Sequence, residues 1–177
     1  MKRIICILAL AALCSFAFAQ KGNMPVVTEA AQVENESGDT IVEVLAVTKD
    51  GETQFWLNVG PLAFGDAILG VYLDPATKLY VPLGSTYDEA MKILQTLKDR
   101  YKERKGSVLE LSCILSVLLP TEEVETVQVI TVRPVLRTQL EFVIEKDGHR
   151  RSTFLSKDDM SSLIFTMKLN GKRLSKL

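Results

Sequence analysis

The sequence predicts an α+β fold with about eight mostly antiparallel strands and two helices packed on the sheet. Two observations lead to this prediction. Apolar and polar residues alternate through much of the chain, as in half-buried strands, and a three- to four-residue apolar period appears in only two places. Those places lie near residues 86–105 and 157–169, so the predicted order is four strands, a helix, four strands and a helix.

The first 19 residues have the pattern of a secretory signal peptide. Lys2 and Arg3 supply a positive start, residues 4–13 form an unbroken apolar run, and residues 17–19 give the small-x-small cleavage pattern. We expect cleavage before Gln20 and an exported, periplasmic or extracellular protein. The apolar segment is too short to cross a bilayer, and no later segment is long enough for a transmembrane helix.

The cysteines argue against a disulfide-stapled scaffold. Lipid anchoring at Cys14 is not expected, because Leu13 stands where a lipoprotein leader needs a small residue. After cleavage Cys113 is the one remaining thiol, and a single cysteine forms no internal disulfide. It lies on the more apolar side of a predicted strand, so we interpret it as a core residue.

Charge excludes further classes of protein. The leader removes two of the 21 basic residues and none of the 22 acidic ones, which leaves a net charge of −3. This charge predicts neither a nucleic-acid-binding surface nor a polybasic membrane anchor. Residues 20–39 are polar and acidic, so we expect a flexible tether there and a single folded α+β domain over residues 40–177.

The predicted strands of the first half are separated by turn signals. Residues 41–48 are rich in Val and Ile, Lys49-Asp50-Gly51 supplies a turn, and residues 53–59 return as the second strand. A glycine-punctuated apolar stretch follows. Residues 74–77 have proline in the second position of a predicted turn, and a short strand over residues 79–83 comes next.

Four more strands are predicted at residues 108–118, 124–132, 135–145 and 149–155. Lys146-Asp147-Gly148 joins the last two strands, and we expect a three-residue loop there with its glycine in the left-handed conformation. That register places Phe154 in the core beside Leu140. It also sets His149 opposite Glu145.

The two helices have clear start and stop signals. Thr86 and Glu89 form a capping box before the first helix, and Ser156 precedes the second with Asp159 three residues later. Asn170-Gly171 is predicted to end the second helix. The apolar stripe of the first helix consists of Tyr87, Ala90, Met91, Leu94, Leu97 and Tyr101.

A Lys-Asp-Gly turn followed by an aromatic strand occurs in both halves, at residues 49–51 and 146–148. Duplication of a half-domain would explain the likeness. Asp-Gly is the most common hairpin chemistry, however, so we favour convergence.

No residue pattern predicts catalysis, a metal or a cofactor. His149 is the only histidine, and no spacing pairs it with a metal ligand or an orienting group. The best candidates for a ligand surface are Trp56, Phe64 and Tyr72, from the glycine-spaced apolar stretch, with a packed hairpin as the alternative.

We therefore expect an exported, non-catalytic binding or interaction protein, whose partner is a protein or a small apolar ligand. One alternative is a small hydrolase that uses dispersed carboxylates, such as Asp66 and Glu110. Another is a carrier whose sheet and helix enclose an apolar ligand. The fold class by itself does not choose among the three.

Overall fold

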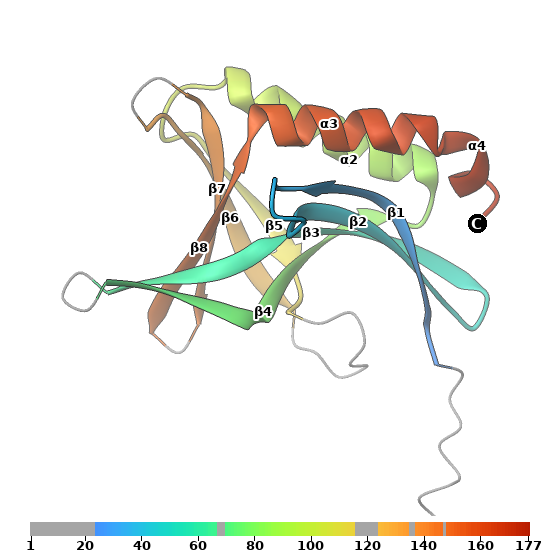
Figure 1. Ribbon diagram of the computed structural model, residues 1–177, viewed down its shortest axis with the longest axis horizontal. Helices are drawn as coiled ribbons and strands as arrows, with labels where there is room; N and C mark the ends of the chain where they lie inside the picture. The colour runs from blue at the N-terminus through green and yellow to red at the C-terminus, as the bar shows by residue number, and fades with distance from the viewer. Residues whose placement is uncertain (1–23, 67–69, 116–123, 135–136, 147) are drawn as a thin grey trace, which may run out of the picture.

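The computed structural model describes residues 24–66, 70–115, 124–134, 137–146 and 148–177, and Figure 1 shows their arrangement. Its strands are β1 (Val26–Glu34), β2 (Thr40–Lys49), β3 (Glu52–Asp66), β4 (Gly70–Gly84), β5 (Val108–Cys113), β6 (Glu125–Val132), β7 (Gln139–Lys146) and β8 (His149–Ser156). Its helices are α2 (Tyr87–Asp99), α3 (Lys157–Leu169) and the one-turn α4 (Gly171–Leu174), with a 3-10 turn at Arg100–Lys102. The predicted α+β class and its two main helices are confirmed.

The strands form two antiparallel halves, β1–β4 and β5–β8, which meet at β3. Pairing across the sheet follows the order β1-β2-β3-β8-β7-β6-β5, and β4 pairs with β3. One edge of β3 pairs with β2 through residues 52–59 and then with β8 at Ala63 and Phe64. Tyr80 of β4 pairs with Ile114, directly after β5, so β4 also contacts the second half.

Gly60 lies where β3 changes partner. A Cβ at this position would be 3.0 Å from the carbonyl oxygen of Ile41 and 3.5 Å from the hydroxyl of Thr153. The first group belongs to β2 and the second to β8. The glycine therefore allows two different strands to approach the same point of β3.

The predicted turn at residues 74–77 is wrong, because β4 continues through it. Leu62 lies opposite Asp74 and Pro61 lies opposite Lys78, so residues 75–77 form a bulge in β4. Bulges bend a strand without ending it. Pairing with β3 on both sides of the bulge keeps the chain in the sheet.

Both helices lie on one face of the β1–β4 half, with α3 over β1 and β2 and α2 over β4 (Figure 1). The two helices run in opposite directions. The hydroxyl of Tyr87 donates to the carbonyl of Met167 at 3.4 Å, and that of Tyr101 donates to the carbonyls of Leu155 and Ser156 at 3.0 and 2.9 Å. Burial raises the pKa of Tyr101, which keeps its hydroxyl protonated as a donor.

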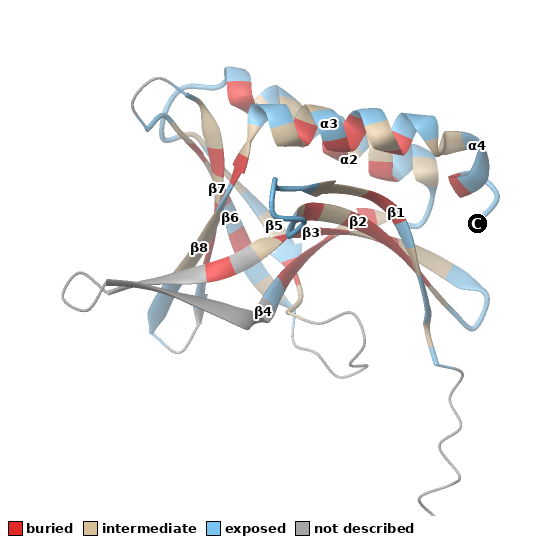
Figure 2. Cartoon of the chain, in the orientation of Figure 1, coloured by how far each residue is buried: buried red, intermediate tan, exposed pale blue. Residues whose placement is uncertain are grey.

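The core lies between the helices and the sheet, and Figure 2 shows buried residues on both helices and on the strands. Its largest fully buried side chains include Phe55, Leu57, Leu79, Leu83, Leu94, Leu97, Phe142 and Met160. Cys113 is also buried, as predicted, and burial raises the pKa of its thiol to about 12. The thiol is therefore protonated at neutral pH and packs as a small apolar group.

The helix starts predicted from the sequence are confirmed. The hydroxyl of Thr86 accepts from the Glu89 backbone, and the Glu89 carboxylate accepts from the backbone of Ser85 and Thr86. These hydrogen bonds hold the pKa of Glu89 below its ordinary value. At α3, the backbone N–H of Asp159 donates to Ser156 Oγ at 3.1 Å.

Part of the predicted tether is a strand. Residues 26–34 form β1, in which Ala30 and Ala31 are buried. The side-chain amide of Asn170 donates to the Ala30 carbonyl at 2.9 Å, and Arg173 donates to the Glu29 carbonyl at 3.1 Å. The small alanines fit beneath α3, and the backbone of β1 is hydrogen-bonded to β2. These contacts form a strand in a segment whose polar composition predicted a flexible tether.

The predicted signal peptide lies outside the described residues and stays a prediction.

The β7–β8 turn has two residues rather than the predicted three. Lys146 lies opposite His149, which rules out the expected pairing of His149 with Glu145. Phe154 is 50% exposed, and it is Leu155 that lies in the core opposite Leu140. The prediction chose the register that buried Phe154 and overlooked Leu155. The left-handed conformation of the turn glycine is confirmed, with φ 74°.

Candidate functional site

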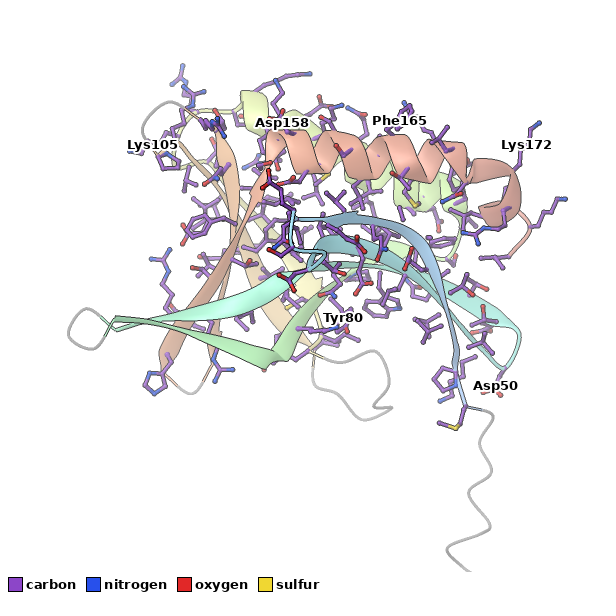
Figure 3. All side chains as sticks on the ribbon, in the orientation of Figure 1. Asp50, Tyr80, Lys105, Asp158, Phe165 and Lys172 are labelled. Carbon is purple, nitrogen blue, oxygen red and sulfur yellow. The ribbon has the colours of Figure 1, made fainter. Side chains whose placement is uncertain are left out.

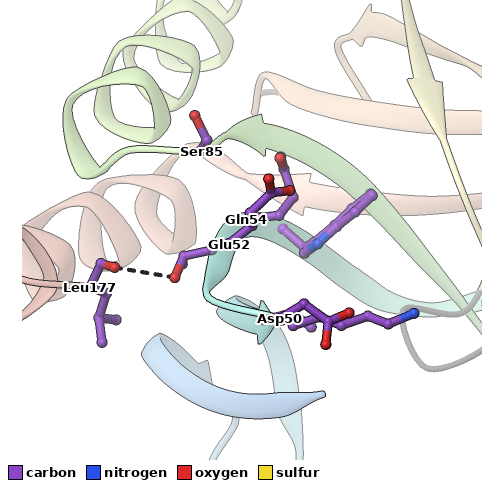
Figure 4. A pocket seen from close by; sticks show the side chains of 9 residues that line it. Asp50, Glu52, Gln54, Ser85 and Leu177 are labelled. Carbon is purple, nitrogen blue, oxygen red and sulfur yellow. Dashed lines mark hydrogen bonds between the residues drawn. The ribbon is translucent and has the colours of Figure 1, made fainter. Parts of the chain in front are cut away.

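A groove of about 780 Å³ lies at the turn end of the β2–β3 hairpin (Figure 4). It is lined by Val47, Lys49, Asp50, Glu52, Thr53, Gln54, Trp56, Ser85 and Leu177. We call it the hairpin groove. Six of these nine residues are polar or charged, so the groove offers many more hydrogen-bonding groups than an apolar cavity does.

The groove exists because two neighbouring strands differ in length at this end. β3 begins at Glu52, whereas β4 ends at Gly84, which lies opposite Phe55. The chain leaves the sheet at Ser85 to begin α2. Among the described strands, only β2 therefore pairs with the first three residues of β3, and their other edge borders the groove.

The turn geometry determines which backbone groups of β3 point from its uncovered edge into the groove. Lys49 lies opposite Glu52, and both Asp50 and Gly51 have positive φ, 53° and 86°, as in a two-residue type I′ turn. The residues that flank such a turn bond to each other across the hairpin. Because the bonding direction alternates along a strand, the backbone N–H and C=O of Thr53 point away from β2 and toward the groove.

The wall of the groove opposite β3 comes from a distant part of the sequence. The Thr53 hydroxyl donates to the Leu177 carbonyl at 3.3 Å, a contact drawn as a dashed line in Figure 4. The same hydroxyl lies 2.9 Å from the hydroxyl of Thr48 on β2. Leu177 is thus held beside β3 by a side-chain hydrogen bond.

Trp56 supplies the aromatic surface of the groove. Alternate residues of a strand face opposite sides of the sheet, so Trp56 lies on the side away from the helices, between the core residues Phe55 and Leu57. It packs on a small apolar cluster of Leu45, Val47, Tyr80 and Ile114. The indole is partly exposed and backed by buried side chains, which is typical of an aromatic contact surface.

The charged residues of the groove lie at its rim. Lys49, Asp50 and Glu52 are all exposed, and they bring both signs of charge to the turn. Ser85 is also exposed and adds a hydroxyl from the start of α2. This arrangement suits hydrogen bonds and weak ionic contacts with a partner at the surface.

The structure does not bring the three predicted ligand residues together in this groove. Trp56 lines it, whereas Phe64 and Tyr72 lie opposite each other in β3 and β4 beyond the Gly60 junction. Their side chains, and that of Asp66, lie outside the described residues. Glu110 accepts from the side-chain amide of Gln128 at 3.2 Å on the surface of β5 and β6.

No sequence pattern indicated that Ser85 or Leu177 would line a groove. Ser85 reaches the groove because β4 ends early, and Leu177 reaches it through the packing of α3 and α4. Within the described ranges, no three His, Cys, Asp or Glu side chains are close enough to hold a metal ion. None of the helices in the same ranges is both long and apolar enough to cross a membrane.

No family model matches this sequence, and no match is found among curated proteins or among solved structures. The groove and the chemistry of its residues are therefore the basis for inferring a function.

Proposed function

We propose that this is an exported, non-catalytic binding protein that holds an extended polypeptide segment in the hairpin groove. The observation that carries the proposal is the uncovered edge of β3 at residues 52–54, beside a partly exposed Trp56. An extended segment adds to such an edge through backbone hydrogen bonds and places alternate side chains in the adjacent hollow. Trp56 and Val47 offer the apolar contact for one of those side chains.

The groove favours a polypeptide over the alternative of an enclosed apolar ligand. A carrier surrounds its ligand with apolar side chains, whereas Lys49, Glu52 and Ser85 are exposed at the rim of this groove. A polypeptide can use the polar rim because its backbone and side chains supply both donors and acceptors.

The proposal of export rests on the signal-peptide pattern of residues 1–19. We expect N-terminal sequencing of the exported protein to find Gln20 as its first residue.

Trp56 makes the groove directly observable, because it is the only tryptophan in the chain. A phage-displayed library of random peptides is selected on the immobilised protein, and enriched peptides are synthesised and titrated into it. We expect the emission of Trp56 to shift on binding. We also expect the Thr53 amide to become protected from hydrogen exchange.

Two substitutions at Thr53 separate backbone pairing from side-chain contact. Thr53→Pro removes the N–H that faces the groove and leaves the bonds between β2 and β3 in place, so peptide affinity should fall about tenfold or more. Thr53→Val keeps the N–H and removes only the hydroxyl, so it serves as the matched control and should bind nearly as well as the wild type. Equal affinity for both variants would contradict edge pairing. If no peptide is enriched and palmitate shifts Trp56 emission, the carrier alternative replaces this proposal.

A further inference from the structure

The outer side of α3 carries large apolar side chains that the core does not use. Phe165 is 62% exposed and Leu169 is 69% exposed, whereas Met160, Leu163, Ile164 and Met167 form the buried side of the same helix. The exposed pair is spaced by four residues, so both side chains lie on one face of the helix. In Figure 3, Phe165 points away from the sheet.

Basic residues lie close to this exposed apolar pair in the sequence. Residues 160–177 contain four basic residues and no acidic one, in a chain that has 22 acidic and 21 basic residues overall. These four are Lys168, Lys172, Arg173 and Lys176, and all are exposed. The ion pairs of Lys102 with Asp99 and of Arg150 with Glu141 lie in other parts of the molecule.

The spacing places the lysines on the same side as the apolar pair. Phe165, Lys168, Leu169 and Lys172 follow the i, i+3, i+4, i+7 pattern of one helix face. α3 ends at Leu169, and Lys172 lies in the one-turn α4, which follows Asn170 with φ −85° and ψ −2°. Figure 3 shows Phe165 and Lys172 both on the outer side, and the acidic Asp158 at the opposite end of α3.

We propose that this basic and apolar surface, formed by Phe165, Lys168, Leu169 and Lys172, docks the protein on an anionic phospholipid bilayer. Lysines concentrate the protein at a negative surface, and a phenylalanine and a leucine on the same helix face enter the boundary between head groups and acyl chains. The net charge of the whole chain predicted no such surface, because the acidic residues lie elsewhere in the sequence.

Charge complementarity and exposed apolar area together favour a bilayer as the occupant. An acidic protein would pair with the lysines, but it would not by itself explain two large apolar side chains that are more than three-fifths exposed. α3 lies along the outside of the molecule (Figure 1), so a flat surface can contact it without meeting the sheet. This surface is separate from the uncovered edge of β3 in the hairpin groove.

Co-sedimentation with lipid vesicles tests the proposal. We expect the protein to bind vesicles that contain phosphatidylglycerol and phosphatidylcholine, not to bind phosphatidylcholine alone, and to dissociate as salt is raised. The double variant Lys168→Gln/Lys172→Gln should bind about tenfold or more weakly, because each lysine near a charged bilayer contributes substantially to binding. Phe165→Ser/Leu169→Ser should lose the fraction of binding that persists at high salt.

The matched control is Arg104→Gln/Lys105→Gln, which removes the same charge from the other end of the helix layer, where Figure 3 labels Lys105. We expect this variant to bind as the wild type does. Absence of binding to the anionic vesicles would overturn the proposal, as would an equal loss in the control. Binding to poly-glutamate without binding to vesicles would replace the bilayer with an acidic protein. Thr53→Pro should bind vesicles normally, which keeps this test independent of the hairpin groove.

Discussion

The β2–β3 hairpin and the β7–β8 hairpin turn on the same three residues, Lys-Asp-Gly, and pair their strands in the same way. The lysine lies opposite the residue after the glycine in both, Lys49 with Glu52 and Lys146 with His149. Beyond the turn they differ. In β3 the buried residues Phe55 and Leu57 come four and six positions after the glycine, whereas in β8 the buried Leu155 comes seven positions after it.

The difference shows that turn chemistry sets the length of a hairpin loop and that the preceding strand sets its buried face. The last core residue of β2 on the helix side is Ala46, three positions before the lysine of its turn. The last core residue of β7 is Ile144, two positions before its lysine. Because side chains alternate along a strand, the two identical turns continue into strands with opposite faces buried.

The same comparison bears on duplication. The first turn joins the second and third strands of its half, and the second turn joins the third and fourth. Equivalent positions after the two turns also face opposite sides. Both facts favour convergence on a common hairpin sequence over descent from one ancestral half.

The largest expected effect is the difference in unfolding free energy between truncating Phe55 in β3 and truncating Phe154 in β8. Phe55→Ala should lower the free energy of unfolding by about 3–5 kcal/mol, because the ring is 1% exposed and leaves a cavity. Phe154→Ala should change it by no more than about 0.5 kcal/mol, because that ring is half-exposed on the other face. Urea denaturation of both variants measures the difference. A comparable loss from Phe154→Ala would mean that β8 buries the face opposite to the one described.

The turns themselves should behave alike. Gly51 and Gly148 have φ of 86° and 74°, and a Cβ on either would meet nothing within 4 Å. Gly51→Ala and Gly148→Ala should therefore each lower the free energy of unfolding by about 1–2 kcal/mol, from left-handed backbone strain alone. Equal losses support two loops of the same type. A neutral Gly148→Ala would indicate a longer and looser β7–β8 loop.

Local signals predicted the helices well because the residues that start them act on their own neighbours. Thr86 with Glu89, and Ser156 with Asp159, are near in sequence and in space. β1 was missed because its order comes from partners far along the chain, such as Asn170. The prediction of which face of β8 is buried was wrong for a similar reason, because the pairing register of a hairpin depends on both of its strands.

The candidate site was predictable only in part. Trp56 stands out in the sequence, and the turn at residues 49–51 is clear from its chemistry. That β4 would end opposite Phe55 and that Leu177 would lie beside Thr53 depend on how the whole sheet is assembled. No pattern in a single sequence carries such information.

The helix starts provide a second pair of matched features, one in each half. Ser156→Ala should lower the free energy of unfolding by about 1 kcal/mol, because Asp159 loses the acceptor for its backbone N–H. Thr86→Ala should lose somewhat less, because the Glu89 carboxylate still accepts from the backbone of Ser85 and Thr86. Thermal unfolding of the two variants ranks them. An unchanged melting temperature for Ser156→Ala would mean that α3 begins elsewhere.

The smallest effect is expected at the residue that follows each turn glycine, which is Glu52 in one hairpin and His149 in the other. Glu52 lines the hairpin groove, so Glu52→Ala should change peptide affinity by a few-fold through a weak, exposed charge. His149 is exposed at the first position of β8, away from the hairpin groove, so His149→Ala should alter neither the free energy of peptide binding nor the free energy of unfolding by more than about 0.5 kcal/mol. Isothermal titration with a selected peptide and urea denaturation measure both variants. A binding defect from His149→Ala would refute the assignment of binding to the β2–β3 hairpin, and Lys146, which lies opposite His149, would be the next residue to replace.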